Sequence, residues 1–329
     1  MLAVGAVFLL RDKAGELPIV GGLVEDTRCP LTNRKPARDA LAERPAVAVK
    51  VENNPVAYPL SGLERAEVVY EEPVEGGLTR FMAIYHCTDA DKIGPVRSAR
   101  AIDPAIMNPY TLILAAAGGN DIVREALAEE DVVLIDEDGA GDAMVRIERA
   151  GIGIEHTLYA NSTALRKAGR REFDDAPVDD IFAFGELKGR AARATTINIT
   201  FSAGASATYE WNGDAWARSD NGTPTLAENG DQLTADNVLI EEHTINFSEV
   251  GDVLGAPSPE IEDVTGSGRA VLFRNGRAVA GRWVRDAVED PVRFETRAGD
   301  EMVLAPGRTW IALVPDDRGD VKGSFSYER

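Results

Sequence analysis

Positive charge and long apolar runs are scarce in this chain of 329 residues, and each scarcity excludes a class of protein. Lys and Arg total 35 against 55 Asp and Glu, which gives a formal net charge of −20. Because binding to nucleic acid or to an anionic membrane surface needs clustered positive charge, we expect neither. The apolar run at residues 2–10 is too short to span a bilayer, since a spanning helix needs about 20 apolar residues.

Cysteine and histidine are also scarce. The two cysteines, Cys29 and Cys87, do not have the spacing of zinc ligands, and the three histidines include no close ligand pair. In a reducing compartment the cysteines would be isolated thiols, whereas in an exported protein they would form one disulfide, worth about 4 kcal/mol. Residues 2–10 leave the choice open: they fit the remnant of an export signal or anchor, and equally a buried strand or a loose terminus.

Length and apolar content suit a chain with a substantial core and about two domains. Residues 29–190 alternate strand and helix patterns, which predicts an α/β domain with a mixed sheet. Residues 191–329 contain two Asn-Gly hairpin signals and no long helical period, which predicts a mainly antiparallel β domain. Residues 1–28 are assigned to the remnant of an export signal or anchor, followed by an extended arm. The predicted fold class is therefore α+β.

The sequence also predicts where the individual elements lie. Short strands are expected at residues 46–51, 67–70, 79–87, 111–117, 132–135, 270–274, 278–284, 293–297, 301–304 and 309–314, and helices at 37–43, after 121, and at 161–169.

Arginine dominates the basic residues, with 28 arginines and 7 lysines, and several arginines lie between residues 80 and 100. Arg80 is on a predicted strand, and Arg97 and Arg100 share one face if residues 97–100 form a turn or the start of a helix. Convergent guanidinium groups suit a phosphate or a carboxylate. The alternative is a structural network in which these arginines pair with nearby acids such as Glu75.

A glycine pair follows the predicted strand at residues 111–117. Gly118 and Gly119 precede a predicted helix, so their main-chain N–H groups are candidates to face an anion at its N-terminus, although a plain turn fits as well. His156 and Asn161 flank a loop rich in hydrogen-bonding groups and are candidates to line the same pocket. The sequence identifies no catalytic residue and no metal site.

Several long motifs resemble the YerB-like lipoprotein family. They are CPLT from Cys29, AVAVKVENNPVAYPLSGLERAEVVYEEPVEGGLTRF, KIGPVRSAR, AAAGGN, EHTLYANS and, later, TGSGRAVLFRNGRAVAGRWVR and LAPGRTWIALVP. The resemblance implies an exported envelope protein of unknown function, attached to the outer face of the cytoplasmic membrane, and it favours a Cys29–Cys87 disulfide. Asp26-Thr27-Arg28 is not a lipobox, so an anchor upstream of Met1 is expected rather than lipid on Cys29.

The layout of residues 79–100 is also similar to that of LytR-CpsA-Psr phosphotransferases, an analogy of fold and arginine placement. Three hypotheses follow. The first is binding of an anionic wall precursor or wall polymer by Arg80, Arg97 and Arg100, with Glu75 orienting an arginine. The second is phosphotransfer on a lipid-linked precursor, with magnesium held near residues 71–75. The third is an adaptor for other envelope proteins through the β domain. Apart from that magnesium we expect no cofactor, and contact with the membrane only through the N-terminal anchor.

Overall fold

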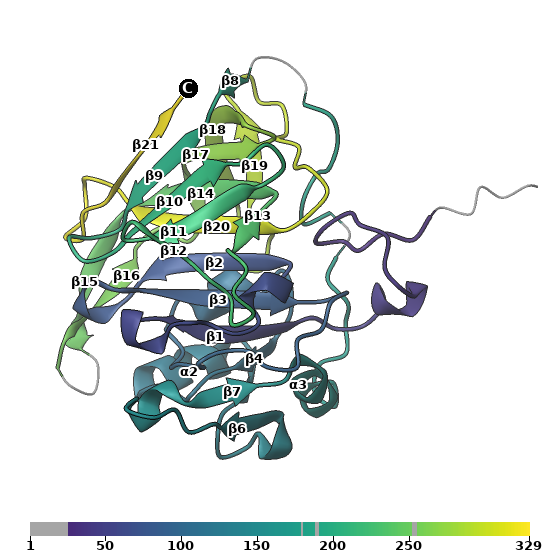
Figure 1. The fold of residues 1–329 in the computed structure, drawn as a ribbon, viewed down its shortest axis with the longest axis vertical. Helices are drawn as coiled ribbons and strands as arrows, with labels where there is room; N and C mark the ends of the chain where they lie inside the picture. Colours follow the sequence, from purple (N-terminus) through teal and green to yellow (C-terminus); the bar gives the residue numbers. More distant parts are fainter. Residues whose placement is uncertain (1–25, 179, 188–190, 252–254) are drawn as a thin grey trace, which may run out of the picture.

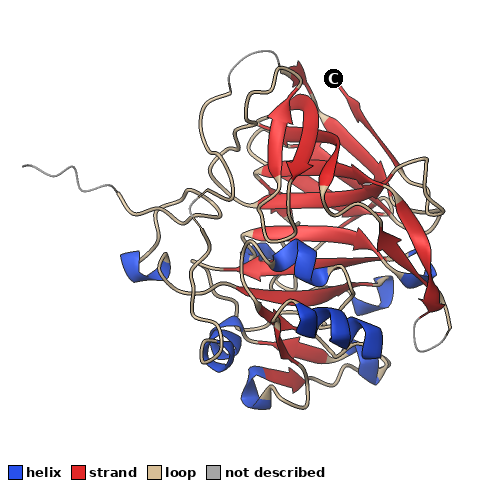
Figure 2. Ribbon diagram, turned by 180° about the vertical axis from the view of Figure 1, so that it is seen from behind, coloured by secondary structure: helices blue, strands red, loops and turns tan. Residues whose placement is uncertain are grey.

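The structure, a computed structural model, describes residues 26–178, 180–187, 191–251 and 255–329. The predicted signal or anchor remnant at residues 2–10 lies outside these ranges. Strands dominate the described chain and the helices are short (Figure 2). The α-helices are α1 (Asp103–Met107), α2 (Asp121–Glu129) and α3 (Ser162–Gly169), and single 3-10 turns lie at Asp39–Leu41, Pro55–Ala57, Leu63–Arg65, Glu75–Gly77, Gly141–Ala143 and Ile154–His156. None of the helices in these ranges has the length and apolar character needed to span a membrane.

One mixed sheet of eleven strands runs through both halves of the chain. Its order is β19 (Arg293–Thr296), β18 (Arg277–Arg285), β17 (Gly266–Arg274), β14 (Asn237–His243), β20 (Thr309–Pro315), β2 (Val68–Pro73), β3 (Thr79–Tyr85), β1 (Val47–Asn53), β4 (Ile113–Ala115) and β5 (Val133–Ile135), with β8 (Ala192–Arg193) beside β18.

The two halves of the sequence meet where β2 pairs in parallel with β20. Figure 1 shows this junction as β20, in yellow, lying beside β2, in blue. Helices gather in the N-terminal half and the C-terminal half is almost entirely strands (Figure 2). The change from mixed strands and helices to mainly strands, expected near residue 190, is therefore present, but the large sheet contains strands from both sides of it.

The remaining strands form smaller sheets. An antiparallel sheet contains β12 (Thr223–Pro224), β11 (Trp216–Asp220), β10 (Ser206–Trp211), β9 (Thr196–Thr200) and β21 (Ser324–Glu328), with β13 (Thr234–Ala235) beside β11. Two further pairs are β15 (Ile245–Gly251) with β16 (Pro257–Ile261), and β6 (Met144–Arg146) with β7 (Leu158–Ala160). The described chain is thus mostly β, with less helix than the predicted α/β domain implied.

The core lies on both faces of the large sheet, which explains the continuous apolar runs in its strands. Along β1, Val47, Val49 and Val51 belong to one buried cluster, together with residues of β9, β10 and β11. Ala48, on the opposite face, belongs to a second cluster that includes residues of α1 and α2. Both faces of β1 are therefore covered, and any charged residue in this strand must find its partners inside the protein.

Three local predictions were wrong. Residues 37–43 contain only a single 3-10 turn, because Pro36 and Pro45 confine the segment. Residues 97–100 form neither a turn nor a helix, and α1 begins at Asp103. Residues 301–304 contain only isolated bridges, from Glu301 and Leu304, and no strand.

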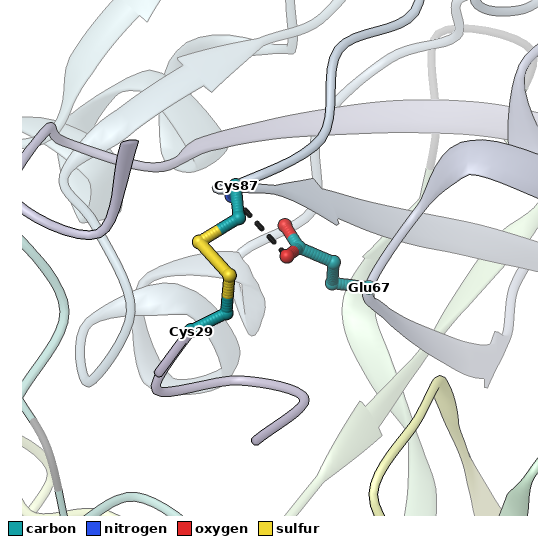
Figure 3. A group of neighbouring side chains, drawn as sticks. All are labelled: Cys29, Glu67 and Cys87. Atoms are coloured by element: carbon teal, nitrogen blue, oxygen red, sulfur yellow. Dashed lines mark hydrogen bonds between the residues drawn. A yellow bond between two sulfur atoms is a disulfide. The ribbon is translucent and has the colours of Figure 1, made fainter. Parts of the chain in front are cut away.

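Cys29 and Cys87 form a disulfide, with a Cα–Cα distance of 6.1 Å (Figure 3). The bridge joins the N-terminal arm to the chain just beyond β3. Glu67 lies beside it and accepts the main-chain N–H of Cys87 at 3.2 Å and that of His86. Burial raises the pKa of Glu67 to about 7.

Candidate functional site

A cleft of about 380 Å³ opens where β1 ends and β3 begins. Its other walls are residues 97–100, the N-terminal end of α2, and Ser258 of β16. Its lining includes Arg80, Arg97 and Arg100 against two acidic residues, Glu52 and Glu75. The three arginines singled out in the sequence therefore meet in one cleft.

Arg80 is held inside the sheet between two glutamates. The strand register places it opposite Glu52 of β1 and opposite Glu72 of β2, on the same face. Neither carboxylate forms an ion pair with it, and no other acid in the described chain does so. Its one hydrogen bond within these residues goes from Nη1 to the main-chain oxygen of Ser98, at 2.6 Å. Arg80 is thus a 93% buried cation without an acidic partner.

The neighbouring positive charges act on Arg80. Burial, together with the charges of Arg100 and Arg97, lowers the pKa of Arg80 to about 9, and the charges of Glu75 and Glu72 oppose this fall only in part. The guanidinium remains charged at pH 7, but burial and the two neighbouring arginines disfavour that charge. An anion in the cleft would oppose all of them.

Main-chain hydrogen bonds position Arg97 and Arg100, although their segment has no regular structure. The N–H of Arg97 donates to the carbonyl of Lys50 at 3.0 Å, and the N–H of Ala99 donates to the carbonyl of Gly118 at 2.8 Å. The segment is thereby fixed between the end of β1 and the turn after β4. Both side chains reach the cleft for this reason, and not because they share a helical face.

Arg97 and Arg100 have acidic partners that use only part of each guanidinium. Arg97 Nε lies 3.4 Å from Glu52 Oε1, and Arg100 Nη2 pairs with Glu75 Oε2. The Nε atom of each arginine is buried and makes no hydrogen bond with the described residues. Nη1 of Arg97 donates to the carbonyl of Glu155 at 3.0 Å, and Nη1 of Arg100 donates to that of Ala99 at 2.7 Å. Neither ion pair is bidentate, so each guanidinium keeps donors without a partner among the described residues.

Glu75 orients Arg100, as the sequence suggested, and it also joins the two halves of the chain. Its Oε1 accepts a hydrogen bond from Ser258 Oγ at 2.6 Å. Burial raises the pKa of Glu75, but the charge of Arg100 and the Ser258 hydrogen bond outweigh it, so the net shift is downward. Glu75 is therefore ionised at neutral pH.

A fully buried lysine underlies the cleft. Lys50, on β1, forms ion pairs with Glu72 and, at 2.8 Å, with Asp103 of α1. Burial raises the pKa of Glu72, and the charge of Lys50 opposes that rise only in part. Lys50 contacts Oε1 of Glu72, whereas the buried Oε2 has no hydrogen-bond partner among the described residues and forms no ion pair with Arg80.

The glycine turn after β4 borders the cleft through Gly119 and Asn120, whereas Gly118 is not among the lining residues. Gly118 has a φ of +86°, which favours glycine there. Asn120 Oδ1 caps α2 by accepting the N–H of Val123 at 2.9 Å. The N–H groups of Gly119 and Asn120 make no hydrogen bond with other described residues.

The two remaining candidates lie outside the cleft. His156 is buried behind it, and its Nδ1 contacts Glu52 Oε2 at 2.7 Å, so it acts on the site only by holding Glu52. Asn161 caps α3 by accepting the N–H of Ala164 at 2.9 Å, and its Nδ2 donates to the carbonyl of Asp91. The structure therefore brings Arg80, Arg97, Arg100, Glu75 and Gly119 together and leaves Asn161 elsewhere.

The acids expected to hold magnesium in the phosphotransferase hypothesis do not gather. Glu71 pairs with Arg218 at 2.8 Å, while Glu72 pairs with Lys50 and Glu75 pairs with Arg100. In the described ranges one cluster has metal-ligand proximity, namely Cys29, Glu67 and Cys87, and its sulfur atoms are bonded to each other.

Comparison with known families gives a match over most of the chain. The N-terminal domain described as "Protein of unknown function (DUF3048)" matches residues 31–174, and the C-terminal domain of the same family matches residues 197–311. The chain belongs to the DUF3048 family. The two matched segments correspond to the α/β region and the mainly β region that the sequence predicts.

Relatives of this DUF3048 protein include a curated Bacillus subtilis (strain 168) protein named "Putative lipoprotein YerB". It is 25% identical over 94% of this chain and 93% of its own length. The crystal structure of YerB from Bacillus subtilis is similar in fold, with a TM-score of 0.75 and 24% identity, covering 91% of this chain and 99% of that chain. The expected YerB-like resemblance is confirmed, whereas the matches give no support to the similarity with LytR-CpsA-Psr phosphotransferases.

Proposed function

We propose that this DUF3048 protein is an extracytoplasmic cell-envelope protein that binds a phosphate- or carboxylate-bearing cell-wall ligand between Arg80, Arg97 and Arg100. The observation that carries the proposal is Arg80, a buried guanidinium without an acidic partner in the described chain, which faces a cleft that two further arginines line. Unsatisfied donors on Arg97 and Arg100 and the N–H groups of Gly119 and Asn120 add to its capacity for an anion.

The location outside the cytoplasm rests on two supports. A relative that covers nearly the whole chain has the name "Putative lipoprotein YerB", and the Cys29–Cys87 disulfide is typical of proteins that fold in an oxidising compartment. We propose attachment to the outer face of the cytoplasmic membrane on the same basis.

The other two hypotheses have weaker support. Phosphotransfer with magnesium needs a carboxylate group, and Glu71, Glu72 and Glu75 each pair with a different cation. An adaptor acting through the β domain needs an exposed apolar patch. Among the described residues 191–329, the exposed large apolar side chains are Leu226 and Phe247.

Isothermal titration calorimetry with inorganic phosphate and with glucuronate tests the proposal. The wild type is compared with Arg80→Gln and with Arg282→Gln, in which an exposed arginine outside the cleft, paired with Glu295, is removed. We expect Arg80→Gln to weaken binding about tenfold or more and Arg282→Gln to change it less than twofold, because a charge-assisted hydrogen bond is worth about 1.5–3 kcal/mol. Absence of binding by the wild type, or equal effects of the two substitutions, would overturn the proposal.

A further inference from the structure

The arginine cleft continues into a second, apolar cavity of about 480 Å³. The two share Arg100, Asn120, Val123 and Ser258 in their linings, so these four residues form the border between them. Beyond this border the lining is mainly apolar, with one carboxylate, Glu260, beside Ile102, Ala105, Ile122, Pro259, Ile261 and Val264.

A third hollow, of about 30 Å³, extends the apolar cavity. It shares Ile102, Ala105, Ile261 and Val264 with that cavity and closes against side chains of the large sheet, both apolar, such as Leu313, and ionisable, namely Glu241, His243 and Arg285. The result is one trench. Its charged end lies at Arg80 and Arg97, and its apolar body runs between α1 and α2 on one side and the chain from β16 to Val264 on the other.

The shape and the chemistry of the trench favour an occupant that is charged at one end and apolar at the other. A free phosphate would fill only the charged end and leave the apolar body in contact with water. A purely apolar molecule would place no charge beside three guanidinium groups. A molecule with an anionic head and one hydrocarbon chain satisfies both parts.

We infer that the ligand of this cleft is a single-chain phosphate amphiphile, whose phosphate contacts Arg80, Arg97 and Arg100 and whose chain lies along the apolar trench. This inference rests on the proposed function and adds the chain to it. Arg100 and Ser258, which line both cavities, mark the junction between head and chain.

The experiment compares four probes by isothermal titration calorimetry below their critical micelle concentrations: inorganic phosphate, butyl phosphate, octyl phosphate and octanol. Each fully buried methylene group raises affinity about fourfold. The trench is partly open, so we expect octyl phosphate to bind at least tenfold more tightly than inorganic phosphate, with butyl phosphate between them and octanol weaker than octyl phosphate.

Two matched substitutions locate the chain. Ile122 lines the apolar cavity and is 44% exposed on α2, so Ile122→Gln should fold normally. Val145, on β6, is 49% exposed and lies outside the trench. We expect Ile122→Gln to weaken octyl phosphate about fivefold and to leave inorganic phosphate unchanged, while Val145→Gln changes neither.

The outcomes separate this inference from the function on which it rests. If inorganic phosphate binds at the arginines and octyl phosphate binds no more tightly, the chain site is wrong and the anion site stands. If octyl phosphate binds more tightly but Ile122→Gln and Val145→Gln have equal effects, the chain lies elsewhere and the inference is overturned. If neither inorganic phosphate nor an alkyl phosphate binds, this inference fails, and if glucuronate does not bind either, the proposed function fails with it.

Discussion

Arg80 lies directly opposite Glu72 in the pairing of β3 with β2, yet the two side chains form no ion pair. Glu72 binds Lys50 instead, and the guanidinium of Arg80 donates to the carbonyl of Ser98. A protein that needed Arg80 only for stability would gain from pairing it with this adjacent carboxylate. The arrangement keeps a buried positive charge available at the cleft.

The first prediction is that Arg80 contributes to binding of the anion and not to the stability of the fold. In Arg80→Met the costly burial of an unpaired charge is removed, so we expect the free energy of unfolding to stay within about 1 kcal/mol of the wild type or to rise. In Lys50→Met, by contrast, Glu72 and Asp103 lose their buried partner, and we expect a loss of about 3–5 kcal/mol. Urea unfolding monitored by circular dichroism measures both.

The same comparison can also contradict the binding role of Arg80. A loss of several kcal/mol in Arg80→Met, similar to that in Lys50→Met, would mean that Arg80 holds the fold together. The cleft would then be a structural ion network.

The second prediction concerns Glu67 and pH. Its pKa is about 7 in the folded protein and near 4.5 when unfolded, so the folded state binds more protons between these values. This contribution to stability is complete below pH 4.5 and is lost as the pH rises through 7, by at most about 3 kcal/mol. Glu67→Gln should lack it. We therefore expect the unfolding free energy of the wild type to fall relative to that of Glu67→Gln as the pH rises from 5 to 8. A difference independent of pH would contradict the raised pKa.

The third prediction concerns the disulfide, which spans a sequence separation of 58 residues. Closing a loop of this length stabilises the folded state by about 4 kcal/mol in the chain-entropy account, so the double variant Cys29→Ala/Cys87→Ala should lose an amount of that order. Cys87 follows the far end of β3 from Arg80, so affinity for inorganic phosphate should not change. Calorimetry on the double variant checks this, and a parallel loss of affinity in a folded protein would show that the bridge shapes the cleft.

The fourth prediction concerns the contact between the two sheets. Arg218 of β11 is fully buried and pairs with Glu71 of β2 and with Asp220. Arg218→Ala leaves these carboxylates without their partner and should cost about 3–5 kcal/mol. Arg282→Ala, which removes an exposed pair with Glu295, should cost less than about 1 kcal/mol. Thermal unfolding distinguishes them, and equal costs would contradict the role assigned to Arg218.

Local signals in the sequence predicted much of the fold. The helices expected after residue 121 and at residues 161–169 are present as α2 and α3, and Asn120 and Asn161 cap them. Asn275-Gly276 lies in the turn between β17 and β18, as its hairpin pattern indicates. These features depend on neighbours within a few residues, which is why they could be predicted.

Contacts between distant segments could not be predicted in the same way. The parallel pairing of β2 with β20 joins residues about 240 positions apart, and no turn or spacing indicates it. Ser258 reaches Glu75 from β16, a strand without a clear sequence pattern. Glu52 did give a signal that was missed, because a glutamate at the end of a strand buried on both faces needs internal partners. Asn161 was assigned to the pocket although its role as a helix cap explains it fully.

The central claim is that an anion binds between Arg80, Arg97 and Arg100. The most direct test is to follow the arginine Nε–Hε signals by ¹⁵N NMR while inorganic phosphate is added to the folded protein. We predict that the Nε signals of Arg97 and Arg100, which lack hydrogen-bond partners among the described residues, and that of Arg80 shift and saturate together, while those of Arg218 and Arg282, which lie outside the cleft, stay in place. Saturating phosphate that leaves the three cleft arginines unmoved would contradict the account.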